Sequence, residues 1–161
     1  MTKLIDRDAD LAKSSVDATR ARPVVLATLQ VRVDPSAERM AIDSALEAGV
    51  PLVLVNVIRL PPYATTMILA GPEHTTLPHE EDLEAVRATA RRAADLGVKT
   101  ELLRVRTKRP VTALLQVVAE RDAGLLVFGP HLGRVGRIRF RRAAQRIRSE
   151  AGCLVWIAPD G

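Results

Sequence analysis

Glycine and arginine, two residue types that bind phosphate, gather near the end of this sequence. Three glycines follow an apolar run that ends at Phe128, and seven arginines without a single acid occupy residues 134–148. Backbone amides at the start of a helix bind phosphate, and the planar guanidinium of arginine pairs with phosphate oxygens. The pattern predicts a cleft for an anion or a nucleotide. Its candidate residues are Gly129, His131, Gly133, Gly136, Arg137, Arg141 and Arg142.

The arginine run has a second interpretation. A dense run of one charge is often no more than a solvated surface, and the sequence leaves this alternative open. If residues 137–148 are helical, Arg137, Arg141 and Arg148 share one stripe of that helix.

The elements around the glycines resemble half of a nucleotide-binding α/β domain. Apolar residues 125–128 predict a strand, residues 140–151 predict a helix, and apolar residues 153–158 predict a closing strand. Ligands of open α/β sheets bind outside the carboxyl ends of the strands. The glycine loop therefore stands where a ligand is expected.

The earlier part of the chain shows the same alternation of strand and helix. Asp34 and Pro35 indicate the start of one helix, and Gly49 indicates its end. The acidic residues 80–82 indicate the start of a second helix, and Pro110 indicates the start of a third. Strands are predicted over residues 24–29, 52–58 and 99–105, the last more polar and therefore at a sheet edge. This order predicts an α/β fold, a single doubly wound domain with a parallel sheet and helices on both faces.

Bulk properties limit the remaining choices. A length of 161 residues predicts one domain, with a flexible N-terminal arm over residues 1–22 and the α/β domain over 23–161. Residues 59–78 fit no regular element. No apolar run reaches the roughly 20 residues that span a bilayer, and one cysteine allows no intrachain disulfide, so we expect a cytoplasmic protein. The segment from Lys99 onward contains 13 basic and 5 acidic residues, and this excess of positive charge attracts anions.

The sequence resembles the universal stress protein family over about residues 23–158. The resemblance rests on ERDAGLLVFG at 120–129, AAQRIRSEAG at 143–152 and CLVWIA at 153–158. It implies a five-stranded parallel sheet of order 3-2-1-4-5. It also implies a homodimer joined through the last strand, from Cys153 to Ala158, with Trp156 either an interface anchor or an ordinary core side chain.

The resemblance also implies where ATP would bind. Family members that bind ATP carry an aspartate at the end of the first strand, then G-x-x-G, nine residues and G-S/T. Here Leu29 stands in place of the aspartate, and an alignment that uses Asp34 instead lengthens the segment. Three residues rather than two separate Gly129 from Gly133, and Pro130 among them lacks an N–H donor. Arg141 and Arg142 stand near the G-S/T position. We therefore predict no tight ATP binding and expect no cofactor, with ATP or another nucleotide kept as the alternative.

Other activities find less support in the residues. No acid–base pair or activated nucleophile is recognisable, so we predict that the protein is not an enzyme. His74 and His79 with their neighbouring glutamates match no standard metal ligand set, and the scarcity of aromatic residues argues against specific nucleic-acid binding. Two functions remain. One is a non-catalytic binding or regulatory module of the universal stress type, and the other is a nucleotide- or phosphate-binding switch that uses the glycine loop and the arginine cluster.

Overall fold

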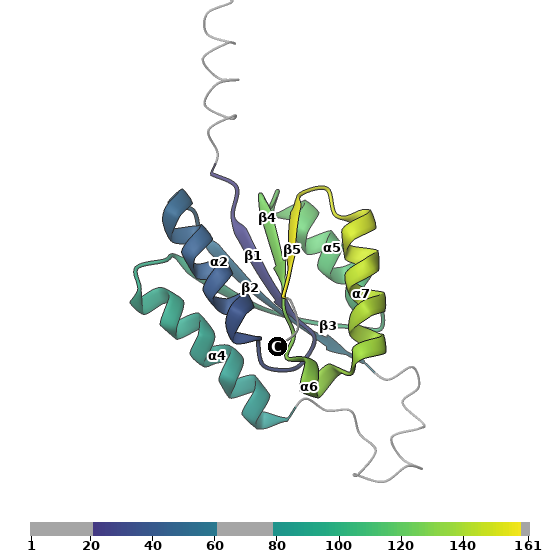
Figure 1. The fold of residues 1–161 in the computed structure, drawn as a ribbon. Helices are drawn as coiled ribbons and strands as arrows, with labels where there is room; N and C mark the ends of the chain where they lie inside the picture. The colour runs from purple at the N-terminus through teal and green to yellow at the C-terminus, as the bar shows by residue number, and fades with distance from the viewer. Residues whose placement is uncertain (1–20, 61–78, 159–161) are drawn as a thin grey trace, which may run out of the picture.

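The computed structural model describes residues 21–60 and 79–158, which form one parallel sheet with helices on both faces (Figure 1). The strands are β1 (Val24–Thr28), β2 (Leu52–Arg59), β3 (Thr100–Thr107), β4 (Leu125–Phe128) and β5 (Leu154–Ile157). The helices are α2 (Pro35–Ala48), α4 (Glu80–Asp95), α5 (Pro110–Glu120), α6 (Leu132–Val135) and α7 (Arg137–Glu150). The strand order β3-β2-β1-β4-β5 confirms the predicted topology.

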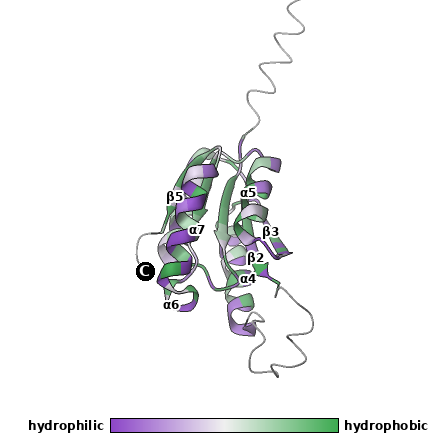
Figure 2. Ribbon diagram, turned by 90° about the vertical axis from the view of Figure 1, so that its right-hand side faces the viewer, coloured by the Kyte–Doolittle hydropathy of each residue, from purple (hydrophilic) through white to green (hydrophobic). Residues whose placement is uncertain are grey.

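Each central strand is buried on both faces because helices cover the sheet on both sides. Val25, Val55 and Phe128 belong to the core beneath α5 and α7. Leu26, Leu54 and Val127 belong to the core beneath α2 and α4. Figure 2 shows the result, with hydrophobic strands enclosed by helices whose outer faces are hydrophilic.

Local signals set the helix ends largely as expected. The Asp34 carboxylate caps α2 by accepting the N–H of Ser36 at 2.9 Å, and Pro35 begins the helix. Gly49 ends α2 at a φ of 63°, a left-handed conformation that suits glycine. The N-terminus of α4 carries Glu80, Glu81 and Asp82, where the helix dipole favours acids.

The structure differs from the sequence-based expectation in two places. The last helix begins at Arg137 rather than near residue 140, and the short helix α6 precedes it.

The predicted edge strand is confirmed, since β3 lies at one edge of the sheet and β5 at the other.

Some expectations lie outside the described residues. These concern most of the N-terminal arm over 1–22 and most of the irregular segment over 59–78, together with His74. Within the described part of the chain, no helix is long and apolar enough to cross a membrane.

Candidate functional site

The candidate site lies at the carboxyl end of the sheet, where β1 is flanked by β2 and β4. The chain leaves β1 toward α2 on one face, and it leaves β4 toward α7 on the other face. This change of direction is the usual place for ligands in open parallel sheets. The segments that meet there are the loop of residues 29–34 and residues 129–136, which include α6.

The backbone of residues 129–131 is already bonded to β1 and to the β1–α2 loop. The N–H of Gly129 donates to the carbonyl of Ala27 at 3.1 Å, and the N–H of His131 donates to the carbonyl of Arg32 at 3.0 Å. Pro130, which lies between them, has no N–H and forms a β-bridge with Val33. Residues 129–131 therefore present no free amide to a phosphate.

The glycines have structural explanations of their own. A Cβ on Gly129 would overlap the Cβ of Ala37 on α2 and stand 3.2 Å from that of Ala158. Gly136 adopts a φ of 86° between α6 and α7, a conformation that other residues rarely adopt. Gly129 thus allows β4 and α2 to pack closely, and Gly136 allows the chain to turn.

The place expected for the G-S/T pair lies inside a continuous helix. Arg141 and Arg142 fall in the second turn of α7, which begins at Arg137. Only the first few amides of a helix lack an intrahelical partner. The N–H groups of Arg141 and Arg142 are therefore hydrogen-bonded within α7. This adds to the obstruction by their side chains that the sequence predicts.

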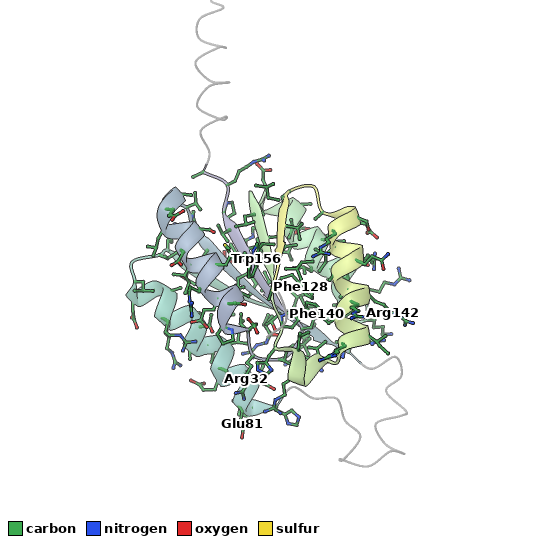
Figure 3. All side chains as sticks on the ribbon, in the orientation of Figure 1. Arg32, Glu81, Phe128, Phe140, Arg142 and Trp156 are labelled. Atoms are coloured by element: carbon green, nitrogen blue, oxygen red, sulfur yellow. The ribbon has the colours of Figure 1, made fainter. Side chains whose placement is uncertain are left out.

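The structure places Arg141 and Arg142, two of the seven candidate residues, in different hollows. Arg142 lines one hollow, whereas Arg141 lines a second hollow beside β5. The two side chains point apart because consecutive helical residues are rotated by about 100°. Arg137, Gly133 and Gly136 are exposed, and His131 is half-buried, with its Nδ1 unpartnered among the described residues. Figure 3 labels Arg142 on α7.

A pocket of about 280 Å³ opens between β2, α5 and α7, and we call it the arginine pocket. Its walls combine five arginines with a small apolar floor. The lining residues are Leu29, Arg59, Arg109, Pro110, Val111, Arg139, Arg142, Ala143 and Arg146. Sequence reasoning did not assign Arg59 or Arg109 to a site, although each stands at the carboxyl end of a strand or the start of a helix.

Within the described residues, most charges of the arginine pocket have no ionic partner. Arg146 pairs with Glu150 at 2.9 Å and donates to Thr112 Oγ1 at 3.0 Å. Among the described residues, Arg59, Arg109, Arg139 and Arg142 form no ion pair.

The like charges act on one another across the pocket. Burial and the neighbouring guanidinium of Arg59 lower the pKa of the Arg139 guanidinium. Guanidinium groups remain charged in proteins, so this repulsion persists until an anion compensates it.

The start of α5 adds further positive potential to the same pocket. Arg109 precedes the helix without a side-chain cap, and no acid occupies the first turn. The first intrahelical bond runs from Ala113 N–H to Arg109 O at 3.0 Å. The N–H groups of Val111 and Thr112 consequently have no acceptor among the described residues, and the helix dipole makes this end partly positive.

The β1–α2 loop orients one wall of the pocket. Leu29 is buried and contributes to the floor. Gln30 adopts a φ of 48°, and its Oε1 accepts the N–H of Arg59 at 3.0 Å. This bond holds the end of β2, and with it the base of the Arg59 side chain, against the loop.

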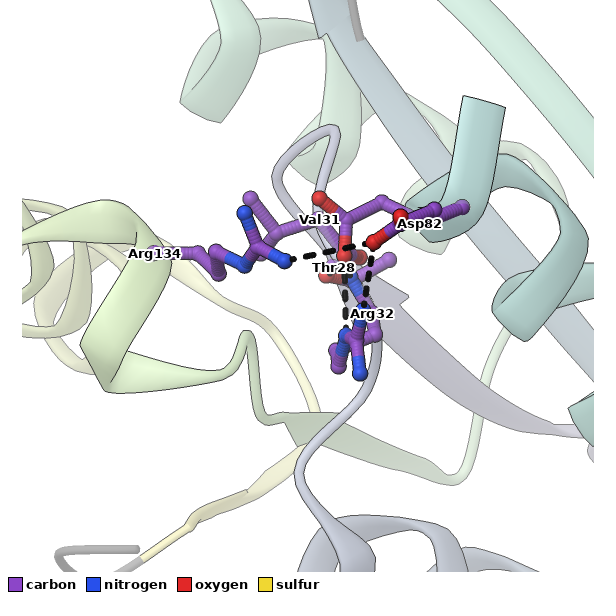
Figure 4. A network of polar contacts seen from close by, with 6 residues as sticks. Thr28, Val31, Arg32, Asp82 and Arg134 are labelled. Carbon is purple, nitrogen blue, oxygen red and sulfur yellow. Dashed lines mark hydrogen bonds and ion pairs between the residues drawn. The ribbon is translucent and has the colours of Figure 1, made fainter. Parts of the chain in front are cut away.

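A separate polar network holds the other end of the same loop to α4 (Figure 4). Asp82 is 1% exposed, and its Oδ1 accepts from the N–H of Arg32 at 3.2 Å and from its Nε at 2.9 Å. Glu81 lies 3.8 Å from Arg32 and 3.7 Å from Arg134. Burial opposes ionisation of Asp82, but the bonds from Arg32 outweigh it and lower the pKa of the carboxyl. Arg32 and Arg134 are thus neutralised here, whereas four of the five pocket arginines have no ionic partner among the described residues.

Metal chemistry has no support in the described part of the chain. No group of three or more His, Cys, Asp or Glu side chains there is placed to hold an ion. His79 precedes α4 without making a cap bond.

Comparison with known proteins decides the family. A model of the universal stress protein family matches residues 21–159. The chain belongs to the universal stress protein family. A search of curated proteins with this chain found no match.

Solved structures of universal stress proteins share the fold. A family protein from Burkholderia pseudomallei is 21% identical, with a TM-score of 0.60 over 87% of this chain and 98% of that one. UspA from Lactobacillus plantarum is 12% identical, with a TM-score of 0.61 over 87% and 100%. The protein from Archaeoglobus fulgidus in complex with dAMP is 24% identical, with a TM-score of 0.54 over 84% and 96%.

Proposed function

We propose that this universal stress protein is a non-catalytic binding module whose ligand is a small anion held in the arginine pocket. One observation carries the proposal. Four arginines without an ionic partner among the described residues converge on one pocket at the carboxyl end of the sheet. Clustered like charges of this kind repel one another, so an anion that binds between them relieves the repulsion.

The glycine loop takes no part in the proposed site. Its amides at Gly129 and His131 are bonded to the backbone of residues 27 and 32, and Pro130 offers none. Tight ATP binding through this loop is therefore not expected. The universal stress protein from Archaeoglobus fulgidus has been solved in complex with dAMP, which supports a phosphate-bearing ligand for this chain. The arginines that line the pocket predict a ligand particular to this chain.

We also propose that two copies pair through β5. The strand lies at a sheet edge, where its backbone groups on one side are free to pair with another chain. Leu154 on this strand is 75% exposed, and pairing of two copies along β5 would remove this apolar side chain from water. Trp156 is half-buried and packs against the α2/α4 core, so only part of it is available to an interface.

Titration with inorganic phosphate at low ionic strength tests the ligand proposal. Arg142→Gln removes one pocket guanidinium, and Arg141→Gln is the matched control because it removes the adjacent charge from the other side of α7. Loss of a charge-assisted hydrogen bond of about 1.5–3 kcal/mol weakens binding roughly 10- to 100-fold. We expect this loss for Arg142→Gln in calorimetry, with little change for Arg141→Gln. Equal affinities of the two variants would contradict the proposal.

A further inference from the structure

Three arginines of α7 lie outside the arginine pocket and form a line of their own, which we call the α7 stripe. Arg137, Arg141 and Arg148 fall four and seven residues apart, so they share one side of the helix, as the sequence predicts. All three are exposed, and none forms an ion pair with another described residue. Figure 1 shows α7 on the outside of the domain, with the sheet on its inner side. The α7 stripe therefore places positive charge on the surface of the molecule.

The length of the α7 stripe favours an extended partner over a small one. Arg148 follows Arg137 by eleven positions, which is about 17 Å along the helix axis. A small anion contacts both ends only if the side chains bend together, and the repulsion between their charges opposes this. A membrane with anionic lipids presents negative charge over a whole plane and attracts each basic side chain near it.

An exposed apolar side chain stands beside the α7 stripe. Ile138 is 72% exposed and lies three residues before Arg141, so the two side chains are neighbours on the helix surface. Arg141 and Arg148 also border the hollow beside β5, which measures about 520 Å³ and has Phe140 and Ile157 in its wall. A membrane surface accommodates this combination, because cationic groups stay among the headgroups while apolar groups enter the boundary with the acyl chains.

The same side of α7 offers less to a nucleic acid. Proteins that bind single strands stack the bases on aromatic side chains. Among the aromatic side chains that the structure describes, Phe128 and Phe140 are buried and stack on each other, and Trp156 packs against the core on the other face of the sheet. Ile138 gains nothing from a sugar–phosphate backbone, whereas the edge of the acyl region removes it from water.

We propose that the outer side of α7 docks on membranes that contain anionic lipids. Arg137, Arg141 and Arg148 lie at the headgroups, and Ile138 lies at the boundary with the acyl chains. None of the residues that line the arginine pocket belongs to this docking surface. The attachment is peripheral and reversible, and salt weakens it because ions screen charges at the surface.

Co-sedimentation of the full chain with vesicles tests the docking surface. Vesicles of phosphatidylcholine alone are compared with vesicles of phosphatidylcholine and phosphatidylglycerol in equal parts. Three arginines at an anionic surface should give at least tenfold tighter partitioning onto the mixed vesicles at low salt, and added salt should reduce this preference. Equal partitioning onto the neutral and the mixed vesicles would overturn the proposal.

A matched pair of double variants locates the charges that act. Arg141→Gln with Arg148→Gln shortens the α7 stripe and keeps residues that favour a helix. Arg104→Gln with Arg106→Gln removes two exposed charges from β3, at the opposite edge of the sheet from β5. Each arginine near an anionic surface contributes a factor of about five.

The α7 double variant should therefore bind the mixed vesicles at least tenfold more weakly, and the β3 double variant less than threefold more weakly. Equal losses would show that net charge rather than α7 drives the binding, and the proposal would then be wrong. Both double variants retain every residue of the arginine pocket, so a failure here leaves the anion site of the proposed function untouched.

Ile138→Gln separates a membrane from a soluble acidic partner. Leu96→Gln is the matched control, since Leu96 is 59% exposed at the end of α4. Ile138→Gln should weaken binding to the mixed vesicles at least threefold and leave binding to polyglutamate unchanged, whereas Leu96→Gln should alter neither. Unchanged vesicle binding by Ile138→Gln would contradict the proposal. Tighter binding to polyglutamate or duplex DNA than to vesicles of equal charge would assign the surface to a soluble partner instead.

Discussion

Gly129 lies so close to Ala37 that a Cβ on Gly129 would overlap the Cβ of Ala37. The contact joins the end of β4 to the first turn of α2, and both residues are completely or almost completely buried. A glycine in a phosphate-type loop is thus explained by helix–sheet packing. The arginine pocket proposed for an anion lies on the other face of the sheet, between α5 and α7.

The packing contact predicts a loss of stability for Gly129→Ala. The added methyl group meets a rigid Cβ rather than the end of a flexible side chain, and overpacking of a core costs about 1–3 kcal/mol. Urea denaturation measures the difference. Ala37→Gly added to this variant removes the overlap and should recover part of the loss.

Gly133→Ala is the control for this prediction. Its Cβ would stand 3.2 Å from the His131 ring without overlapping it, and alanine favours the α6 helix. We expect a neutral or slightly stabilising effect. A Gly129→Ala variant as stable as the original chain would show that the contact is not tight.

The buried Asp82 predicts a stability difference that depends on pH. Its pKa lies below the ordinary value because bonds from Arg32 outweigh burial, so ionised Asp82 stabilises the folded state above its unfolded pKa of about 3.9. Asp82→Asn should cost about 1–3 kcal/mol near pH 7, measured by urea denaturation. The difference should shrink as the pH falls below about 4, through the lowered pKa of the folded state.

Glu84→Gln on the same helix serves as the comparison for Asp82. Glu84 is exposed and pairs with Arg87 and Arg91 at the surface, where ion pairs contribute little. We expect almost no change in stability at any pH. A pH-independent loss for Asp82→Asn would indicate altered packing rather than a lost charge.

The occupied glycine loop predicts weak binding of ATP. Titration with ATP and Mg²⁺ should give no dissociation constant in the micromolar range, because the amides of Gly129 and His131 already have acceptors. Pro130→Ser would supply an extra N–H but would not release these two, so we expect no gain of ATP affinity. A micromolar constant for either protein would show that the loop rearranges to hold the triphosphate.

The exposed edge of β5 predicts a dimer that a single charge disrupts. A chain of 17.5 kDa should sediment at about twice that mass, and Leu154→Asp should convert it to the monomer, because burying two unpaired carboxylates at an interface is costly. Leu96→Asp changes another exposed leucine, on the remote end of α4, and should leave the dimer intact. If the Leu154→Asp variant remains a dimer, the interface lies elsewhere.

Much of the fold follows from local patterns in the sequence. The apolar runs that become β1, β2 and β4 fill two cores at once, and a residue that faces either core must be apolar. Asp34, Pro35 and Gly49 act through the geometry of their own backbone or side chains, so their positions predict the ends of α2 directly. The family resemblance rested on such segments and is confirmed.

The site was only partly predictable because it depends on which distant groups meet. The arginine run near the C-terminus pointed to an anion, yet adjacent Arg141 and Arg142 line different hollows. The earlier start of α7, at Arg137, engages the amides that the family pattern leaves for phosphate. No local signal shows that Arg32, a hundred residues upstream, accepts the N–H of His131.

The sequence by itself determined the order of strands and helices, the parallel sheet and the excess of positive charge, since these depend on periodicity, capping and composition. Tertiary structure decided which arginines share a pocket and which amides remain free. Charges and hydrogen bonds act over a few ångströms in space, and only the folded chain brings Leu29, Arg59, Arg109 and Arg142 within that range.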